Sequence, residues 1–216
     1  MSKPDANTYA LLGLLDRHPW SAYELTAFMR QSMLRAVWPR AESRIYEGLK
    51  KLVKLGFATS DEQMTGKRKR TIYTITKQGR KALARWALEP GRDVIFEHEA
   101  LLKLAYADQH GPDGLRRVLE NIRASTERDA LACAEGFDML AEQLREADAN
   151  AAPPPANRMV NAFTFLVLQA RLDWLQRADA LLQTWEDLDP DESKCAEAVE
   201  FYREGAGLLR QRLELP

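Results

Sequence analysis

Apolar positions near the start of the chain recur at the spacing of short helices. An apolar stretch that follows Thr8, the expected N-cap, comprises Tyr9, Leu11, Leu12, Leu14 and Leu15. Ser21 and Glu24 form a capping-box pattern, in which each side chain accepts a hydrogen bond from the other residue's backbone N–H. This pattern predicts a second helix that begins at Ala22.

A third helix is predicted over residues 41–55. Its apolar positions at helical spacing are Ile45, Leu49, Leu52 and Leu55, and Gly56 follows where a left-handed C-terminal residue belongs. The opposite side of this helix carries Arg44, Lys50, Lys51 and Lys54. Gly48 lies in the interior of the helix and costs about 1 kcal/mol relative to alanine.

A β-hairpin and a fourth helix are predicted next. Residues 57–60 and 71–76 are rich in β-branched and aromatic side chains, and the polar stretch from Asp61 to Arg70 separates them, with Gly66 at its turn. Thr76 is the expected N-cap of a helix that runs to about Leu88. The residues that we expect this helix to bury are Leu83, Trp86 and Ala87.

The rest of the chain is predicted to be helical. A helix that starts at Gly111-Pro112-Asp113 continues for more than about 30 residues, and a second one covers residues 158–185. Residues 150–156 are too rich in proline for a helix and form a connector. The last apolar positions at helical spacing are Val199, Tyr202, Ala206, Leu209 and Leu213. This amphipathic helix must pack on its own domain or on a second protomer.

The balance of charged residues changes at the same place where the helical pattern is interrupted. Residues 1–90 carry 17 Lys and Arg against 8 Asp and Glu, a net charge of +9, whereas residues 91–216 carry 14 against 24, a net charge of −10. The Pro-Gly pair at residues 90 and 91 marks the boundary between two predicted domains, 1–90 and 91–216. The basic domain either meets a polyanion such as nucleic acid or simply has a solvated surface of different composition.

Composition excludes several classes of protein. No apolar run approaches the ~18 residues that cross a bilayer, and no secretory signal is recognisable, so we expect a cytoplasmic protein. Cys133 and Cys195 lie far apart, without the spacing of a metal or redox site. The histidines, His18, His98 and His110, are scattered. We therefore expect no metal, no cofactor and no enzymatic activity.

The order of elements in the basic domain is that of a winged helix-turn-helix, in which one helix enters the major groove of DNA. Burial of Ile45, Leu49 and Leu52 would leave Arg40, Ser43 and Arg44 free to probe the groove, with Lys50 on a phosphate. The hairpin, or wing, carries four consecutive cations that we expect to contact the DNA backbone, Lys67, Arg68, Lys69 and Arg70. Alternatively, these charges only keep the hairpin soluble.

These residues resemble the PadR family of bacterial transcriptional regulators. The segments that carry the resemblance are 9–15, 21–25, 43–52 and 70–80, and two looser matches are 96–104 and 172–178. The resemblance implies a mainly α fold with a small β-hairpin, a winged helix-turn-helix followed by a helical dimerisation domain. Residues 191–216 run beyond the end expected for the family.

The resemblance also implies a homodimeric repressor of nearby genes, released from DNA in some members by small aromatic molecules. It assigns Tyr23 and Tyr46 to DNA phosphates, although both rings could instead pack between helices. A two-fold dimer would place two recognition helices roughly 34 Å apart, which predicts a pseudo-palindromic operator. The competing function is a winged helix that serves protein–protein assembly without specific DNA binding.

An aromatic stripe in the acidic domain is the candidate effector site. Phe163, Trp174 and Trp185 are spaced eleven residues apart, close to three helical turns each time. Residues at this spacing share one helix face and could line an aromatic pocket at the dimer interface. Aromatic residues at helical spacing are more often simple core packing, so both interpretations stay open.

Overall fold

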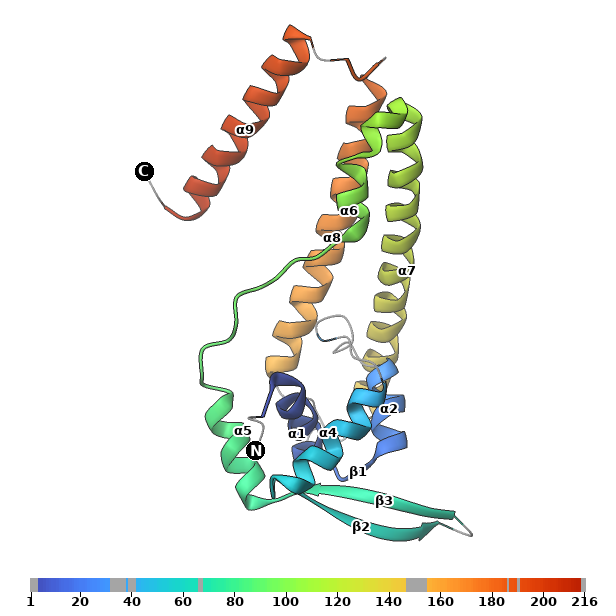
Figure 1. The fold of residues 1–216 in the computed structure, drawn as a ribbon, viewed down its shortest axis with the longest axis vertical. Coiled ribbons are helices and arrows are strands. Elements are labelled where there is room, and N and C mark those ends of the chain that lie inside the picture. Colours follow the sequence, from blue (N-terminus) through green and yellow to red (C-terminus); the bar gives the residue numbers. More distant parts are fainter. Residues whose placement is uncertain are drawn as a thin grey trace. The chain divides into compact units, whose positions relative to one another are not determined.

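The computed structural model describes residues 4–31, 38, 42–65, 68–146, 155–185, 187–189 and 191–214. In chain order, the elements are α1 (Ala6–Arg17), β1 (Trp20–Ser21), α2 (Ala22–Gln31), α4 (Glu42–Lys54), β2 (Ala58–Thr65), β3 (Arg68–Ile75), α5 (Lys77–Trp86), α6 (Glu99–Leu104), η1 (Ala107–His110), α7 (Gly111–Glu146), α8 (Pro155–Gln183) and α9 (Glu192–Arg212) (Figure 1). The expected fold class, mainly α with a small hairpin in a winged helix, is confirmed.

Most of the helix caps and helix ends expected in residues 1–90 are confirmed. The Ser21 N–H donates to Glu24 Oε2 over 3.0 Å and the Glu24 N–H donates to Ser21 Oγ over 3.2 Å, so the capping box exists as predicted. Thr76 Oγ1 accepts from the Gly79 N–H over 3.0 Å and caps α5. Gly56 has a φ of 72°, as expected after α4. Ala87 is exposed, so its predicted burial is wrong.

The predicted cap of the first helix is wrong. Asp5, not Thr8, is the N-cap of α1: Asp5 Oδ1 accepts from the Thr8 N–H over 2.8 Å and from the Thr8 hydroxyl over 2.6 Å. Both residue types can cap a helix, but Thr8 is buried in the first turn, where its hydroxyl needs a partner. The helix therefore begins at Ala6.

The sheet is larger than the sequence predicts. Its three strands have the order β1-β3-β2, and both pairings are antiparallel. Ala58 lies opposite Ile75 and Thr65 lies opposite Arg68, so most of the stretch expected as a polar loop belongs to the strands. Main-chain hydrogen bonds hold the ladder, and they do not require apolar side chains. Gly66, the predicted turn residue, lies outside the described residues.

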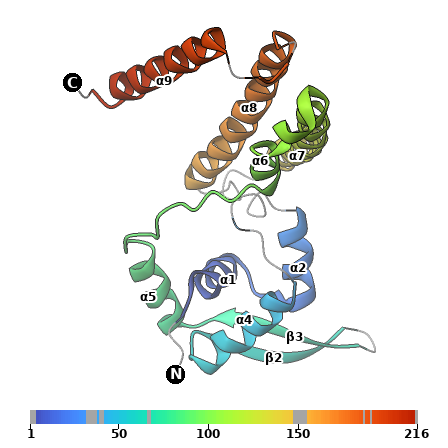
Figure 2. The same ribbon diagram turned by 45° about the horizontal axis from the view of Figure 1, so that its top comes forward.

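One core holds the winged helix together. It is formed by buried side chains of α1, α2, α4 and the sheet, namely Leu11, Leu12, Leu14, Leu15, Leu25, Met29, Ile45, Leu49, Leu52, Ala58 and Ile75. Figure 2 shows α1 between α5 and α2, with α4 running beside the strands. The apolar face of α4 is thus turned inward and its polar face is left for solvent.

Two glycines permit close packing in this core. A Cβ at Gly48 of α4 would clash with Leu11 Cδ1 of α1, which explains a glycine in a helix interior despite its low propensity. A Cβ at Gly79 would clash with the carbonyl oxygen of Phe57, where the start of α5 passes the start of the hairpin. Glycine is the residue that lets two backbones approach this closely.

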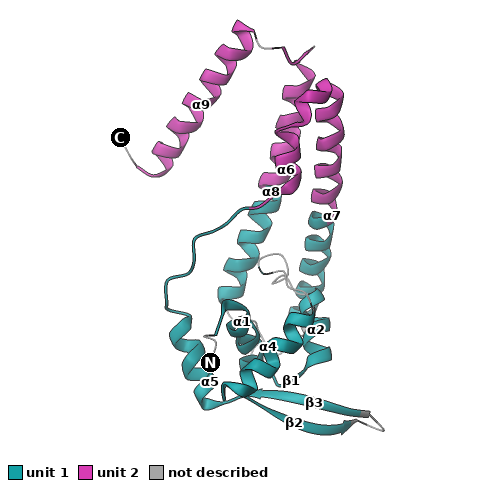
Figure 3. Ribbon diagram, viewed as in Figure 1, with its two compact units in different colours: residues 1–96, 129–169 teal, residues 97–128, 170–216 magenta. Residues whose placement is uncertain are grey.

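The chain forms two compact units, which Figure 3 colours separately. One contains residues 1–96 and 129–169, and the other contains residues 97–128 and 170–216, so α7 and α8 each contribute to both. Both long helices were predicted and are confirmed. α8 begins at Pro155, earlier than expected, because proline is well suited to the first turn of a helix.

The second unit has its own small core. Leu119 and Ile122 of α7 pack with Leu175 and Leu182 of α8. Arg123 forms an ion pair with Asp179, and Arg171 Nη2 donates to Thr126 Oγ1 over 3.0 Å. These polar contacts tie α7 to α8 beside the core.

The predicted C-terminal helix exists as α9. It buries none of its residues, so the expectation that it packs on its own domain is wrong. Of its apolar positions, Ala206 is half-buried and the others are exposed, namely Val199, Tyr202, Leu209 and Leu213.

Candidate nucleic-acid interface

The helix α4 has one buried face and one polar face. Ile45, Leu49 and Leu52 are almost wholly inaccessible to solvent. Ser43, Arg44 and Lys50, the predicted groove and phosphate contacts on this helix, are all exposed. Arg40 lies outside the described residues. A rigidly anchored helix with cations and a hydroxyl on its outer side has the form that major-groove recognition requires.

The start of α1 braces α4. Asn7 Nδ2 donates to the backbone oxygen of Arg44 over 3.4 Å, and Lys51 Nζ lies 3.7 Å from Asp5 Oδ2. The hydrogen bond from the Thr8 hydroxyl is the main reason why the pKa of Asp5 lies below its ordinary value, and Lys51 lowers it further. Asp5 therefore stays ionised and joins the two helices. This contact between the two helices was not predicted from the sequence.

Both tyrosines that the resemblance assigns to phosphates reach solvent. Tyr23 in the first turn of α2 is 78% exposed and Tyr46 on α4 is 45% exposed. The alternative interpretation, in which both rings pack between helices, does not describe Tyr23. A phenolic hydroxyl on an exposed ring is able to donate to a phosphate oxygen.

The cations of the wing have acidic neighbours. Lys69 Nζ lies 3.2 Å from Glu62 Oε2 across the hairpin. Arg70 Nη1 lies 2.8 Å from Glu24 Oε1 on α2. Arg68 is the first residue of β3, and Lys67 lies outside the described residues. The sequence predicted four consecutive cations for the DNA backbone, and the structure pairs two of them with carboxylates.

Glu24 has two roles that use its two oxygens. Oε2 accepts from the backbone N–H and, over 2.7 Å, from the hydroxyl of Ser21, while Oε1 faces Arg70. The hydrogen bonds from Ser21, followed by the charge of Arg70, lower the pKa of Glu24 below its ordinary value of 4.5. The cap of α2 is thereby tied to the wing. Sequence reasoning found the cap but had no signal for a partner 46 residues away.

The predicted aromatic stripe is divided between the two units. Phe163 belongs to the first unit and is 61% exposed. Trp174 and Trp185 belong to the second, where both are partly buried against its core. Trp185 Nε1 is buried and has no hydrogen-bond partner among the described residues. Such a donor is costly to leave unsatisfied, which favours an acceptor from outside the described residues.

The first turns of α8 carry an exposed apolar face. Met159, Phe163 and Leu166 recur at spacings of four and three residues and are all exposed. An apolar stripe at this spacing on a water-exposed helix is typical of a surface that another protein covers.

The described residues contain neither a candidate membrane span nor a candidate metal site. No described helix is long and apolar enough to cross a membrane. No group of three or more described His, Cys, Asp or Glu side chains is arranged to hold a metal ion.

Residues 11–85 match the model of the Transcriptional regulator PadR-like family. The negative transcriptional regulator PadR of Bacillus subtilis (strain 168) is 36% identical over 81 residues, which are 37% of this chain and 44% of that protein. The matched segment thus spans less than half of the curated relative.

Solved structures match over a longer part of the chain. Bacillus subtilis PadR in complex with operator DNA has a TM-score of 0.67 at 22% identity, covering 82% of this chain and 99% of that one. The same protein in complex with p-coumaric acid has a TM-score of 0.61 at 21% identity, covering 82% of this chain and 98% of that one. At these identities the likeness shows a shared fold, which extends beyond the winged helix.

Proposed function

We propose that this chain, whose residues 11–85 match the PadR-like family of transcriptional regulators, is a homodimeric repressor that binds a pseudo-palindromic DNA operator. The observation that carries the proposal is the exposed polar face of α4, opposite a face that is fully buried. Burial holds the helix rigid, so its outer side chains can be aligned with base edges at little entropic cost.

The proposed DNA contacts fall into two groups. Arg40, Ser43 and Arg44 reach base edges in the major groove, where Arg44 suits the two acceptors of a guanine. The remaining side chains hold phosphates and set the register without reading sequence, and they are Tyr23, Tyr46, Lys50, Lys67, Arg68, Lys69 and Arg70. Binding of this kind blocks polymerase from the promoter.

The two halves of the chain have different tasks in this proposal. Residues 1–90 bind DNA, and residues 91–216 form the dimer and receive the effector. The acidic character of the second half keeps it away from the DNA, because like charges repel at close range. The exposed stripe of Met159, Phe163 and Leu166 supplies apolar surface for the dimer.

We assign the effector to the neighbourhood of Trp174 and Trp185, which are both partly buried against the core of the second unit. A small phenolic acid such as p-coumaric acid, which the relative from Bacillus subtilis binds, has a ring to stack on indole and a carboxylate to accept from Trp185 Nε1. The ligand releases repression if its affinity is higher for dimers in which the distance between the two winged helices does not match the operator.

Fluorescence anisotropy tests the DNA-binding part of the proposal. The full chain is titrated onto the duplex just upstream of its own gene and onto a scrambled duplex, at several salt concentrations. We expect specific binding that weakens steeply with salt, and a loss of roughly tenfold or more for Arg44→Ala. Lys81→Ala, an exposed cation on α5, is the matched control and should bind normally. No preference for either duplex would favour the protein-assembly module instead.

Tryptophan fluorescence tests the effector. p-Coumaric acid should quench wild-type emission in a saturable manner and lower operator affinity. Trp185→Phe should bind the acid more weakly, while Trp86→Phe, far from the proposed site in sequence, should bind it normally. If p-coumaric acid quenched both variants equally, Trp185 would not be part of the effector site.

A further inference from the structure

The helix α9 presents an apolar surface that no described part of the chain covers. None of its residues is buried, and its large side chains are mostly in solvent, with Phe201 69%, Tyr202 71% and Leu209 66% exposed. Exposed apolar surface of this extent on a helix marks a site of protein interaction. The question is which surface covers it.

The spacing of the apolar residues indicates a second helix. Cys195, Val199, Tyr202, Ala206, Leu209 and Leu213 follow one another at alternate intervals of four and three residues. This is the a/d pattern of a coiled coil, in which one helix packs its seam into that of another. The occupant of the α9 seam is therefore a helix with a similar seam.

The charges on α9 identify which helix fits. Glu192, Glu197 and Glu200 lie in its first half, whereas its second half carries Arg203, Arg210 and Arg212 against the acid Glu204. A parallel copy of the helix would place like charges side by side. An antiparallel copy places acidic halves beside basic halves and also opposes the two helix dipoles, so both electrostatic terms are favourable.

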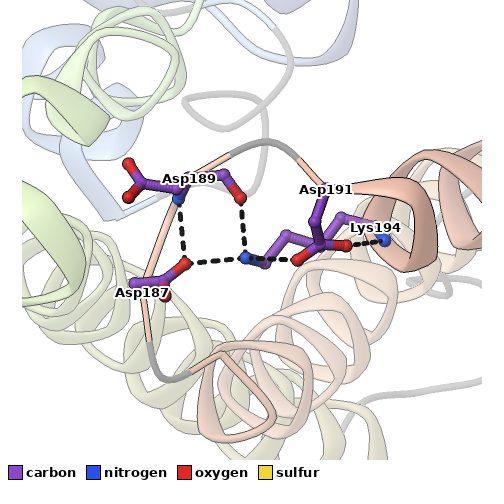
Figure 4. Close-up of polar contacts among 4 residues, drawn as sticks. All are labelled: Asp187, Asp189, Asp191 and Lys194. Carbon is purple, nitrogen blue, oxygen red and sulfur yellow. Dashed lines mark hydrogen bonds and ion pairs between the residues drawn. The ribbon is translucent and has the colours of Figure 1, made fainter.

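The cation in the first half does not weaken this polarity. Lys194 Nζ lies 2.7 Å from Asp187 Oδ1 and 2.9 Å from Asp191 Oδ2, and it donates to the backbone oxygen of Asp189 over 2.7 Å (Figure 4). Its charge is thus neutralised within the segment that leads into α9. The beginning of the helix remains acidic.

We propose that α9 pairs antiparallel with α9 of a second copy of this chain, about a two-fold axis at Glu204. In this register Tyr202 faces the small Ala206 of the other copy, Val199 faces Leu209, and Cys195 faces Leu213. Each large side chain meets a smaller or flexible one, which is how a seam packs without voids.

This pairing extends the homodimer proposed above and rests on it in taking the second copy as the partner. Up to a fifth of the chain has no counterpart in the solved relatives, whose matches cover 82% of this chain and 98% to 99% of their own. The α9 pair would be an addition to the dimer proposed above.

Disulfide trapping tests the register in the full chain. Cys133, whose pKa is raised by burial, is first replaced by serine so that Cys195 is the remaining thiol. The variant Cys133→Ser is then compared with Cys133→Ser, Leu213→Cys after oxidation with diamide in dilute solution. The two thiols of one chain are about 27 Å apart along the helix, too far for a disulfide within the chain.

We expect a covalent dimer on a non-reducing gel only when Leu213→Cys is present. A dimer formed equally by Cys133→Ser alone would mean parallel pairing, and no dimer in either variant would mean that α9 does not pair; both results overturn the proposal. A further variant, Cys133→Ser, Cys195→Ser, Leu213→Cys, should not crosslink, because the antiparallel register keeps the two new thiols at opposite ends.

Self-association provides a second measurement. Leu209→Glu places a charge in the seam, whereas Gln211→Glu places the same charge on the opposite side of the helix. We expect the dimer dissociation constant, from sedimentation velocity on dilution, to rise roughly tenfold for Leu209→Glu and to stay unchanged for Gln211→Glu. Equal constants in the two variants would overturn the pairing.

Operator binding in the same samples separates this proposal from the proposed function. A protein that is trapped through α9 but prefers no duplex contradicts the repressor function alone. A protein that binds its operator specifically but is never trapped contradicts the α9 pair alone.

Discussion

Arg70 of the wing and Glu24 of the α2 capping box form an ion pair, with 2.8 Å between Nη1 and Oε1. Arg70 therefore reaches back to the helices instead of standing free at the hairpin tip. The same carboxylate accepts both hydrogen bonds from Ser21. One side chain thus joins the start of helix α2 to strand β3 of the wing.

Replacing Glu24 should separate these two roles. Glu24→Gln keeps a capping-box acceptor but loses the ion pair, whereas Glu24→Ala loses both. We expect Glu24→Ala to lower the free energy of unfolding by about 1 kcal/mol, and Glu24→Gln by less. Urea denaturation measures both values. Glu62→Gln, which removes the exposed partner of Lys69, is the control, and a loss as large as that of Glu24→Ala would contradict this assignment.

Stability should also depend on pH through Glu24. The pKa of Glu24 is lower in the folded chain than its ordinary value of 4.5, so its contribution is complete above that value and is lost as pH falls through the folded pKa. The difference in unfolding free energy between wild type and Glu24→Gln should therefore shrink on acidification. Parallel urea titrations at about pH 6 and about pH 3 measure it. A difference that grows on acidification would be inconsistent with the ion pair.

The acidic residue on the wing should weaken DNA binding. Glu62 lies 3.2 Å from Lys69 and places a negative charge where phosphates would approach. Glu62→Gln is expected to tighten binding to the operator by about threefold at low salt, an effect that salt reduces. Lys69→Ala should weaken binding to all duplexes and lower the salt slope by about one. If Glu62→Gln binds more weakly, the pair positions the wing instead of masking a cation.

Replacing each of three glycines by alanine should change the stability of the chain by different amounts. Gly79→Ala drives a methyl group into the backbone oxygen of Phe57, which cannot rotate away, and we expect a loss of about 1–3 kcal/mol. Gly48→Ala meets the end of a leucine side chain, so repacking and a gain in helix propensity offset part of its cost. Gly205→Ala on α9 meets nothing within 4 Å and should not destabilise the chain. A lower melting temperature for Gly48→Ala than for Gly79→Ala would contradict this account.

Interactions between residues close in sequence were predictable. The capping box of α2, the Thr76 cap and the left-handed Gly56 each involve residues within one helical turn, and all three are present. The long helices α7 and α8 were equally visible, because a sustained apolar period of three to four residues admits few other structures. The candidate DNA-binding face of α4 followed from the same period, since the positions left over by the core must face solvent.

The tertiary structure alone decided the contacts between residues far apart in sequence. The pairing of Arg70 with Glu24, the need for glycine at position 48 and the extension of the hairpin through polar residues depend on how backbones meet in space. So does the exposure of α9, whose pattern required a partner without saying which. The physical reason is that local sequence specifies helix faces and caps, whereas the distance between two faces is fixed only after the core has packed.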